Sequence, residues 1–163
     1  MPKKLPLEVV HEVRDACLCL ATQRAARLLA RRFDRAFAPL GLTNGQFSLM
    51  MALCAPQAPT LGRLADFLAM DRTTLTAALK SLERRGLVRV AADEEDRRAR
   101  RLFLTDAGCA ALAAAAPIWR KEHGAVEAEL SSSEADRLRK SLKKLGAESK
   151  PQARRETHER PSQ

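Results

Sequence analysis

Apolar side chains recur at helical spacing through a long segment near the N-terminus that contains neither glycine nor proline. The segment runs from about Asp15 to Ala38. Its large apolar side chains are Leu20, Leu28, Leu29, Phe33 and Phe37. Because residues three and four positions apart share one face of a helix, this pattern predicts a single helix of about 24 residues. Pro39 and Gly41 mark its end.

A second pattern is the absence of charge between residues 41 and 59, in a chain of which 30% is charged. Thr43 stands before the apolar segment NGQFSLMMALC and is a suitable N-cap residue. We therefore predict a short helix here that lies buried at the centre of the fold. The segment APQAP interrupts the chain before the next helix.

Two short helices joined by a three-residue turn are predicted between residues 60 and 86. Thr60 caps LGRLADFL, and Asp71 caps RTTLTAALKSLERR, which ends at Gly86. The second helix buries a leucine stripe at residues 75, 79 and 82. Its opposite face carries Thr73, Thr76, Ala77, Lys80 and Arg84. Such a pair of helices is typical of a helix-turn-helix.

The periodicity then changes from that of a helix to that of strands. LVRVAA and RLFLT are short and alternating, and they predict a β-hairpin. The connecting run DEEDRRARR, residues 93–101, is charged at eight of its nine positions. It forms the hairpin tip, and the hairpin is a wing beside the two helices. Asp93, Glu94 and Glu95 are interpreted as ordinary hairpin surface.

Composition adds a fold class and a class of partner. The 163 residues suit one domain, and the 4% of aromatic residues leave a core of Leu, Ala, Val and Met, which favours a mostly α fold. The net charge is +9 and the pI is about 10.0. This excess of basic over acidic residues predicts a polyanionic partner such as nucleic acid or an anionic membrane surface.

Two absences predict a cytoplasmic protein. The N-terminal residues contain no apolar run typical of a signal peptide, and no stretch approaches 18 apolar residues. The four cysteines, at positions 17, 19, 54 and 109, lie in apolar helical contexts rather than in a disulfide framework. We expect them to be reduced.

The exposed face of the second short helix suits the major groove of DNA. Threonine can bond to phosphates or base edges, and Arg72 is placed for a phosphate or a guanine. Arginines on the wing can enter the adjacent minor groove, and Asp96 can pair with one of them and stiffen the hairpin. The alternative is that Asp71 and the threonines merely cap and coat a solvent-facing helix.

These segments together resemble the MarR/SlyA family of bacterial transcriptional regulators. The resemblance covers roughly residues 15–145, and its most specific segments are DRTTLT…L..LERRGLV and the wing pattern D..DRR….LT..G. It implies a homodimeric winged helix-turn-helix protein in which terminal helices form the dimer interface. It also implies that Arg98 reaches the minor groove, while Asp96 and Arg97 support it or touch the DNA backbone.

The expected organisation is a mostly α chain with a small β-hairpin wing. Residues 1–40 are expected to form an N-terminal dimerisation region, 41–105 the winged helix-turn-helix, 106–146 the C-terminal dimerisation helices and 147–163 a disordered tail. The expected function is a repressor that binds a pseudo-palindromic operator as a homodimer. The predicted DNA-binding residues are Arg63, Arg72, Thr73, Thr74, Thr76, Lys80, Asp96, Arg97 and Arg98. The alternatives are a sequence-indifferent architectural DNA binder and a protein-interaction module.

The sequence leaves three alternatives for the signal that releases DNA: a small molecule, an oxidant, or no signal at all. His11 and Trp119 are candidates for an effector pocket, although a packed interface is the preferred interpretation. Cys17 and Cys19 are candidates for oxidation. On one helix they would point ~200° apart, so they could not hold one ion, and we interpret all four cysteines as core residues.

No pattern predicts catalysis, a metal site or a cofactor. The sequence has no phosphate-binding loop, no nucleophile elbow and no metal-ligand spacing among its three histidines. We therefore do not expect an enzyme.

Overall fold

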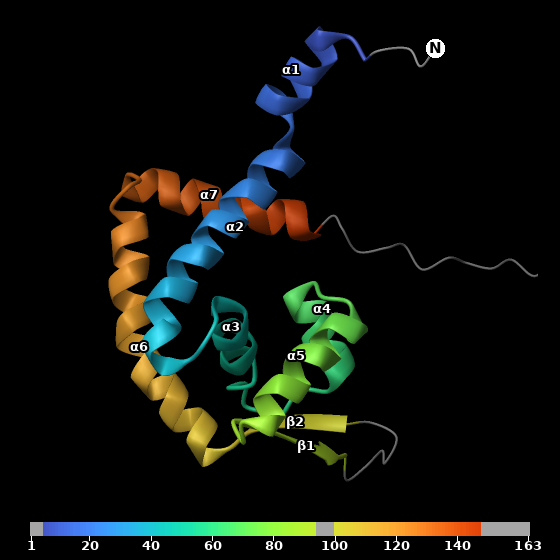
Figure 1. Ribbon diagram of the computed structural model, residues 1–163, viewed down its shortest axis with the longest axis vertical. Coiled ribbons are helices and arrows are strands. Elements are labelled where there is room, and N and C mark those ends of the chain that lie inside the picture. The colour runs from blue at the N-terminus through green and yellow to red at the C-terminus, as the bar shows by residue number, and fades with distance from the viewer. Residues whose placement is uncertain (1–4, 94–99, 148–163) are drawn as a thin grey trace, which may run out of the picture. The chain divides into compact units, whose positions relative to one another are not determined.

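The computed structural model describes residues 5–93 and 100–147 (Figure 1). The described part confirms the mostly α class with one hairpin. Its elements are α1 (Leu7–Ala16), α2 (Leu18–Phe37), the 3-10 helix η1 (Ala38–Leu40), α3 (Asn44–Ala52), α4 (Leu61–Leu68), α5 (Arg72–Arg84), β1 (Val88–Ala92), β2 (Arg100–Leu104), α6 (Asp106–Glu127) and α7 (Ser132–Ala147). Helix α7 therefore includes Ala147, the first residue of the predicted tail. Residues 148–163 lie outside the described range.

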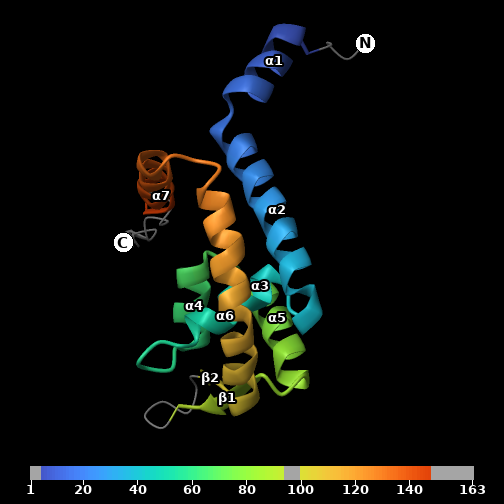
Figure 2. The same cartoon turned by 90° about the vertical axis from the view of Figure 1, so that its left-hand side faces the viewer.

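The predicted long helix is confirmed as α2, but it begins at Leu18 rather than near Asp15, because the chain breaks at Cys17 (Figure 2). Cys17 is extended, with φ −74° and ψ 106°, and its sulfur accepts a hydrogen bond from the amide of Leu20 at 3.4 Å. The thiol thus acts as the N-cap of α2. Helix α1, which precedes the break, was not predicted at all.

The core is built from the C-terminal part of α2 and from buried side chains of α3, α4 and α5. The ring of Phe37 stacks on that of Phe47 with 4.7 Å between centroids, and Met50, which like Phe47 belongs to α3, is fully buried. The predicted central position of α3 is confirmed. The leucine stripe of α5 is also confirmed, since Leu75, Leu79 and Leu82 are all buried.

Local capping explains where these helices begin and end. Thr43 and Gln46 form a reciprocal capping box at the start of α3. The side chain of Thr60 accepts the amide of Arg63 at the start of α4. Helix α5 ends at Arg84, and the φ of 68° at Gly86, two residues on, permits the amide of Leu87 to bond back to the carbonyl of Leu82 at 3.0 Å. The predicted caps are confirmed.

The hairpin is antiparallel, with Val90 opposite Leu102 and Ala92 opposite Arg100. Its second strand also contacts the segment before α4. The amide of Leu102 donates to the carbonyl of Pro59 at 3.1 Å, and Thr60 forms an isolated bridge with Arg101. The wing is therefore attached to the helix-turn-helix by backbone bonds.

A close approach joins the start of α6 to the end of α5. The hydroxyl of Thr105 donates to the carbonyl of Gly86 at 2.6 Å, and its amide donates to the carbonyl of Leu87 at 3.2 Å. Gly108 lies against the same carbonyl so tightly that a Cβ there would stand 2.1 Å from the oxygen of Leu87. Only glycine fits this position.

Residues up to 122 form one compact unit and residues from 123 onward a second, so that the boundary falls within α6. In the second unit, Ser131 and Glu134 form a capping box at the start of α7. The bond from Ser131 holds the pKa of Glu134 below its ordinary value. Helix α7 exposes three leucines, Leu138, Leu142 and Leu145. Within the described residues, no helix is long and apolar enough to cross a membrane.

Candidate nucleic-acid interface

Helix α5 presents a polar face opposite its buried leucines. Four of the nine residues predicted to contact DNA line one shallow hollow on this face. The residues around this hollow are Arg72, Thr73, Thr76, Ala77 and Lys80. The structure thus brings four of the predicted residues together on one helix. Residues 73, 76 and 77, which lie between the two cations in this lining, have small side chains.

The N-cap of α5 uses Thr74 as well as Asp71. The Asp71 carboxylate accepts the amide of Thr74 at 2.8 Å and its hydroxyl at 2.6 Å. These bonds hold the pKa of Asp71 below its ordinary value. The cap is therefore complete above the ordinary pKa and is lost as the pH falls through the lowered one. Because the hydroxyl proton of Thr74 is used in the cap, this residue has only its oxygen lone pairs and methyl group for another partner.

Arg72 lies at the first turn of α5 and reaches back over α4. A Cβ at Gly62 would stand 3.4 Å from its Nη2 atom, so the guanidinium rests against the glycine. Thr76 donates its hydroxyl to the carbonyl of Arg72 at 2.6 Å. The side of Thr76 that faces outward therefore offers a methyl group and acceptor lone pairs.

A second hollow separates α5 from the hairpin. It is lined by Leu61, Thr76, Leu79, Lys80, Glu83, Val90, Arg100 and Leu102. Arg100, the first residue of β2, brings a cation to the same hollow as Lys80. Arg100 was not among the predicted DNA-binding residues, although its place at the end of the charged run was a usable signal.

The outer face of the hairpin carries Arg89, whose guanidinium carbon lies 4.4 Å from the centroid of the Phe103 ring. This stacking orders an exposed cation. The predicted wing residues Asp96, Arg97 and Arg98 lie outside the described residues. Their roles stay predictions.

Asp93 corrects one interpretation of the charged run. It is not hairpin surface: it is 6% exposed and pairs with Nε of Arg101 through Oδ2. Arg101 also donates from Nη1 to the carbonyl of Ala58 at 3.0 Å. The sequence alone could not reveal this pair. Asp93 and Arg101 are eight positions apart, and they meet only because of the register in which β1 and β2 pair.

Arg63 does not share the hollows of α5. It is exposed on α4 and lines a separate hollow with Cys54, Gln57 and Phe67. The predicted phosphate contact by Arg63 would therefore be made outside the stripe on α5.

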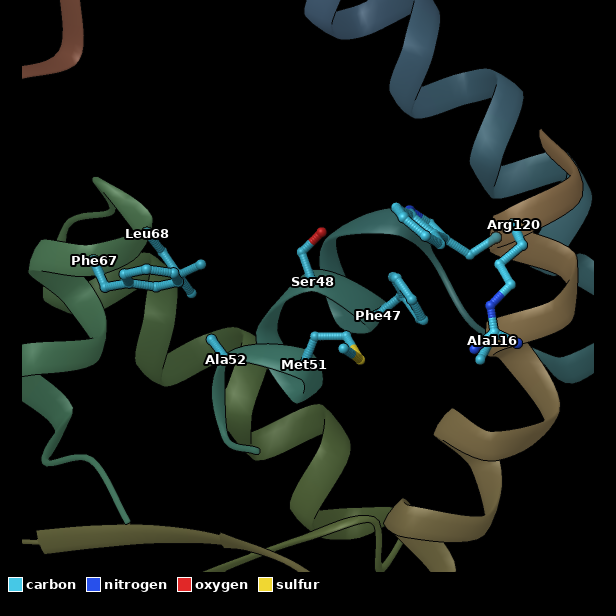
Figure 3. Close-up of a pocket in the computed structure, with 9 residues that line it drawn as sticks. Phe47, Ser48, Met51, Ala52, Phe67, Leu68, Ala116 and Arg120 are labelled. Carbon is cyan, nitrogen blue, oxygen red and sulfur yellow. The ribbon is translucent and has the colours of Figure 1, made fainter. Parts of the chain in front are cut away.

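The effector candidates lie apart as well. Trp119 lines an apolar pocket of about 490 Å³ whose other residues are Phe47, Ser48, Met51, Ala52, Phe67, Leu68, Ala116 and Arg120 (Figure 3). Side chains from α3, α4 and α6 surround this space. His11 is exposed on α1 and is not among the lining residues. The two candidates do not form one site in this chain.

The interpretation of the cysteines as core residues is wrong. Cys19, Cys54 and Cys109 are exposed and Cys17 is half-buried. Since Cys17 is extended rather than helical, the angular argument about the pair does not apply. Burial raises the pKa of the Cys54 thiol, with a further contribution from Cys109. Nowhere in residues 5–93 and 100–147 do three or more potential metal ligands gather.

Comparison with known proteins shows the family. The model of the MarR family matches residues 42–99. The DNA complex of the Mycobacterium tuberculosis transcriptional regulator MOSR is 41% identical with a TM-score of 0.74, over 81% of this chain and 95% of that one. The transcriptional repressor CouR, bound to a 23-mer DNA duplex, is 30% identical with a TM-score of 0.73, over 87% of this chain and 98% of that one.

A curated relative is the HTH-type transcriptional regulator TtmR of Methylorubrum extorquens, which is 35% identical over 94 residues. That match takes in 58% of this chain and 48% of TtmR, so the chain spans about half the length of this relative. All of these proteins are transcriptional regulators rather than enzymes. With its winged helix-turn-helix and these likenesses, the chain belongs to the MarR family of transcriptional regulators.

Proposed function

We propose that the chain is a cytoplasmic repressor that binds a pseudo-palindromic operator as a homodimer. The observation that carries this proposal is the hollow on α5, where Arg72 and Lys80 flank small side chains, beside a hairpin that adds Arg100. A major groove accepts a helix with such a face, and adjacent cations contact the phosphates. MOSR and CouR, which are similar along most of this chain, are both seen with DNA.

Exposed apolar side chains support the homodimer. Helix α1 exposes Leu7, Val9, Val10 and Val13, and α2 exposes Leu18, Leu28 and Leu29. Seven large apolar side chains on two successive helices are more than a lone soluble chain usually leaves in water. A two-fold pairing buries the same surface on both copies and presents two α5 helices to one duplex.

The first test is selection of bound duplexes from sheared genomic DNA at physiological salt, followed by sequencing. We expect enrichment of an inverted repeat whose half-site centres lie one DNA turn apart, ~34–36 Å. Such spacing would reflect the two-fold axis of the dimer.

Two other outcomes would replace the proposal. Binding without enrichment, with the affinity set only by salt, would indicate a sequence-indifferent architectural protein. Duplex bound no better than heparin would indicate a protein-interaction module.

We further propose that the pocket beside Trp119 receives a small effector. Its walls are apolar except for Ser48 and Arg120, and Phe67 at its edge is 76% exposed. An apolar ligand with an anionic group fits this lining, because it would cover the aromatic rings and place its charge near the guanidinium. Since α4 both lines the pocket and packs against α5, an occupant that shifts α4 would also shift α5.

The probe for this pocket is anilinonaphthalene sulfonate, an aromatic anion whose fluorescence rises in apolar surroundings. Arg120→Gln is expected to weaken its binding about tenfold, through loss of a charged hydrogen bond. The matched control is Lys121→Gln, which removes the same charge from the next residue, outside the pocket lining. Fluorescence titration of the three proteins measures the effect.

If Arg120→Gln and Lys121→Gln bind the dye with equal affinity, the pocket is not the binding site of the dye and the effector proposal fails.

The oxidant hypothesis makes a different prediction, because Cys17 caps α2 through its sulfur. Hydrogen peroxide would then release operator DNA from the native protein and not from Cys17→Ser, whose hydroxyl keeps a cap.

A further inference from the structure

The root of the wing is held by a buried carboxylate. Asp93 follows the last residue of β1 and is 6% exposed, and its partner Arg101 belongs to β2. The Arg101 guanidinium binds Asp93 through Nε and the carbonyl of Ala58 through Nη1 at 3.0 Å. One side chain thus connects both strands of the hairpin to the loop that precedes α4.

That loop runs along β2 and leads directly into the helix-turn-helix. Its Pro59 carbonyl accepts the amide of Leu102 at 3.1 Å, and Thr60 bridges to Arg101. Thr60 is also the N-cap of α4. The connection from wing to helix therefore passes through three consecutive residues, 58 to 60, and Arg101 holds the first of them.

The energetics favour a positional role for this pair. Burying a carboxylate has a desolvation cost that an ion pair repays only with good geometry and further hydrogen bonds. The pair joins the residue after β1 to the second residue of β2, so it links the two strands near the ends at which β1 stops and β2 begins. A hairpin fixed in this way loses less conformational freedom on binding than one that pivots about its root.

We propose that Asp93 and Arg101 are positioning residues of the nucleic-acid interface. This role rests on the proposed function. Asp93 and Arg101 hold the wing at a set angle to α5, so that the wing and α5 engage one duplex together. Neither residue needs to touch DNA for this purpose.

The sign of the effect separates positioning from simple electrostatics. Asp93 is an anion beside an interface for a polyanion, so neutralising it should tighten DNA binding if only charge mattered. If the carboxylate positions the wing, Asp93→Asn should weaken binding even though the net charge becomes more positive. The two mechanisms predict opposite changes from one substitution.

The test uses the full-length protein and the duplex recovered by the genomic selection. We expect Asp93→Asn to raise the dissociation constant about tenfold, and Arg101→Lys to raise it several-fold although the charge is kept. Asp136→Asn is the control, since it removes a carboxylate from the exposed pair with Arg139 on α7. Its dissociation constant should match that of the native protein.

Amide hydrogen exchange provides a readout independent of DNA. The Leu102 amide should exchange about tenfold faster in Asp93→Asn and Arg101→Lys, while the Leu87 amide at the end of α5 stays protected. This pattern would show a loosened wing root on a folded helix-turn-helix. If Asp93→Asn binds the duplex as tightly as the native protein, or more tightly, the positioning role is overturned while the proposed function stands. If the native protein itself enriches no duplex in the genomic selection, the proposed function is overturned, and the positioning role is overturned with it.

Discussion

Gly108→Ala is expected to destabilise the fold strongly, although alanine is the best helix former and Gly108 lies inside α6. A Cβ at this position would stand 2.1 Å from the carbonyl oxygen of Leu87 and 3.1 Å from its carbon. Both are backbone atoms, so no side chain can rotate away. The start of α6 would have to retreat from the end of α5.

The retreat would strain the two bonds from Thr105 to residues 86 and 87. Overpacking costs about 1–3 kcal/mol and each lost hydrogen bond about 1 kcal/mol, so a loss of about 3–5 kcal/mol is expected. Urea denaturation followed by circular dichroism measures it. A loss of this size is a large fraction of the stability of a typical domain, about 5–15 kcal/mol.

The same helix supplies the control. A Cβ at Gly124 meets nothing within 4 Å. Gly124→Ala should therefore be neutral or stabilising by up to about 1 kcal/mol, from helix propensity alone. If both alanine variants unfold at the same urea concentration, the close approach at Gly108 does not limit the fold.

Arg72→Ala is the substitution expected to reduce operator binding most. The side chain is exposed at the first turn of α5, so its loss should leave the fold intact. An arginine contact to a guanine edge contributes about 1–3 kcal/mol. Because a homodimer carries two copies, the operator complex should lose about 2–6 kcal/mol, a rise of at least about 30-fold in the dissociation constant.

Titrations against operator variants at several salt concentrations distinguish the two partners open to Arg72. A base contact predicts that specificity relaxes at one position in each half-site. A phosphate contact predicts uniform weakening and a shallower salt dependence. Lys140→Ala, which removes one exposed cation from α7, is the charge-matched control. Unchanged operator affinity in Arg72→Ala would remove this residue from the interface.

The predictable parts of this fold are those that depend on near neighbours in sequence. Thr43, Thr60 and Asp71 cap helices through residues three positions away, and the leucine stripe of α5 repeats every three or four residues. The hairpin follows from alternation in two short segments. These features predicted the helix-turn-helix, the wing and four of the residues that line the hollow on α5.

The unpredicted parts depend on contacts that form only in three dimensions. Cys17 ends one helix and caps the next without any glycine or proline to signal a break. Asp93 meets Arg101 because of the hairpin register and the burial of its root. The apolar pocket draws its walls from three helices that are separated in sequence. The minor-groove role of Arg98, which lies outside the described residues, stays a prediction from resemblance.

The joint at Cys17 bears on how fast two copies would exchange partners. Here the amide of Cys17 donates to the carbonyl of Val13 at 3.3 Å, and its carbonyl accepts the amide of Ala21 at 3.0 Å. A continuous helix would have to leave its partner as one rigid rod, exposing its whole apolar face to water in a single step. In the proposed dimer, two helices joined at one residue can leave the partner one after the other, so α1 can dissociate while α2 stays bound. Stepwise release leaves the total binding free energy unchanged, but it replaces one large barrier with two smaller ones separated by a partly bound intermediate.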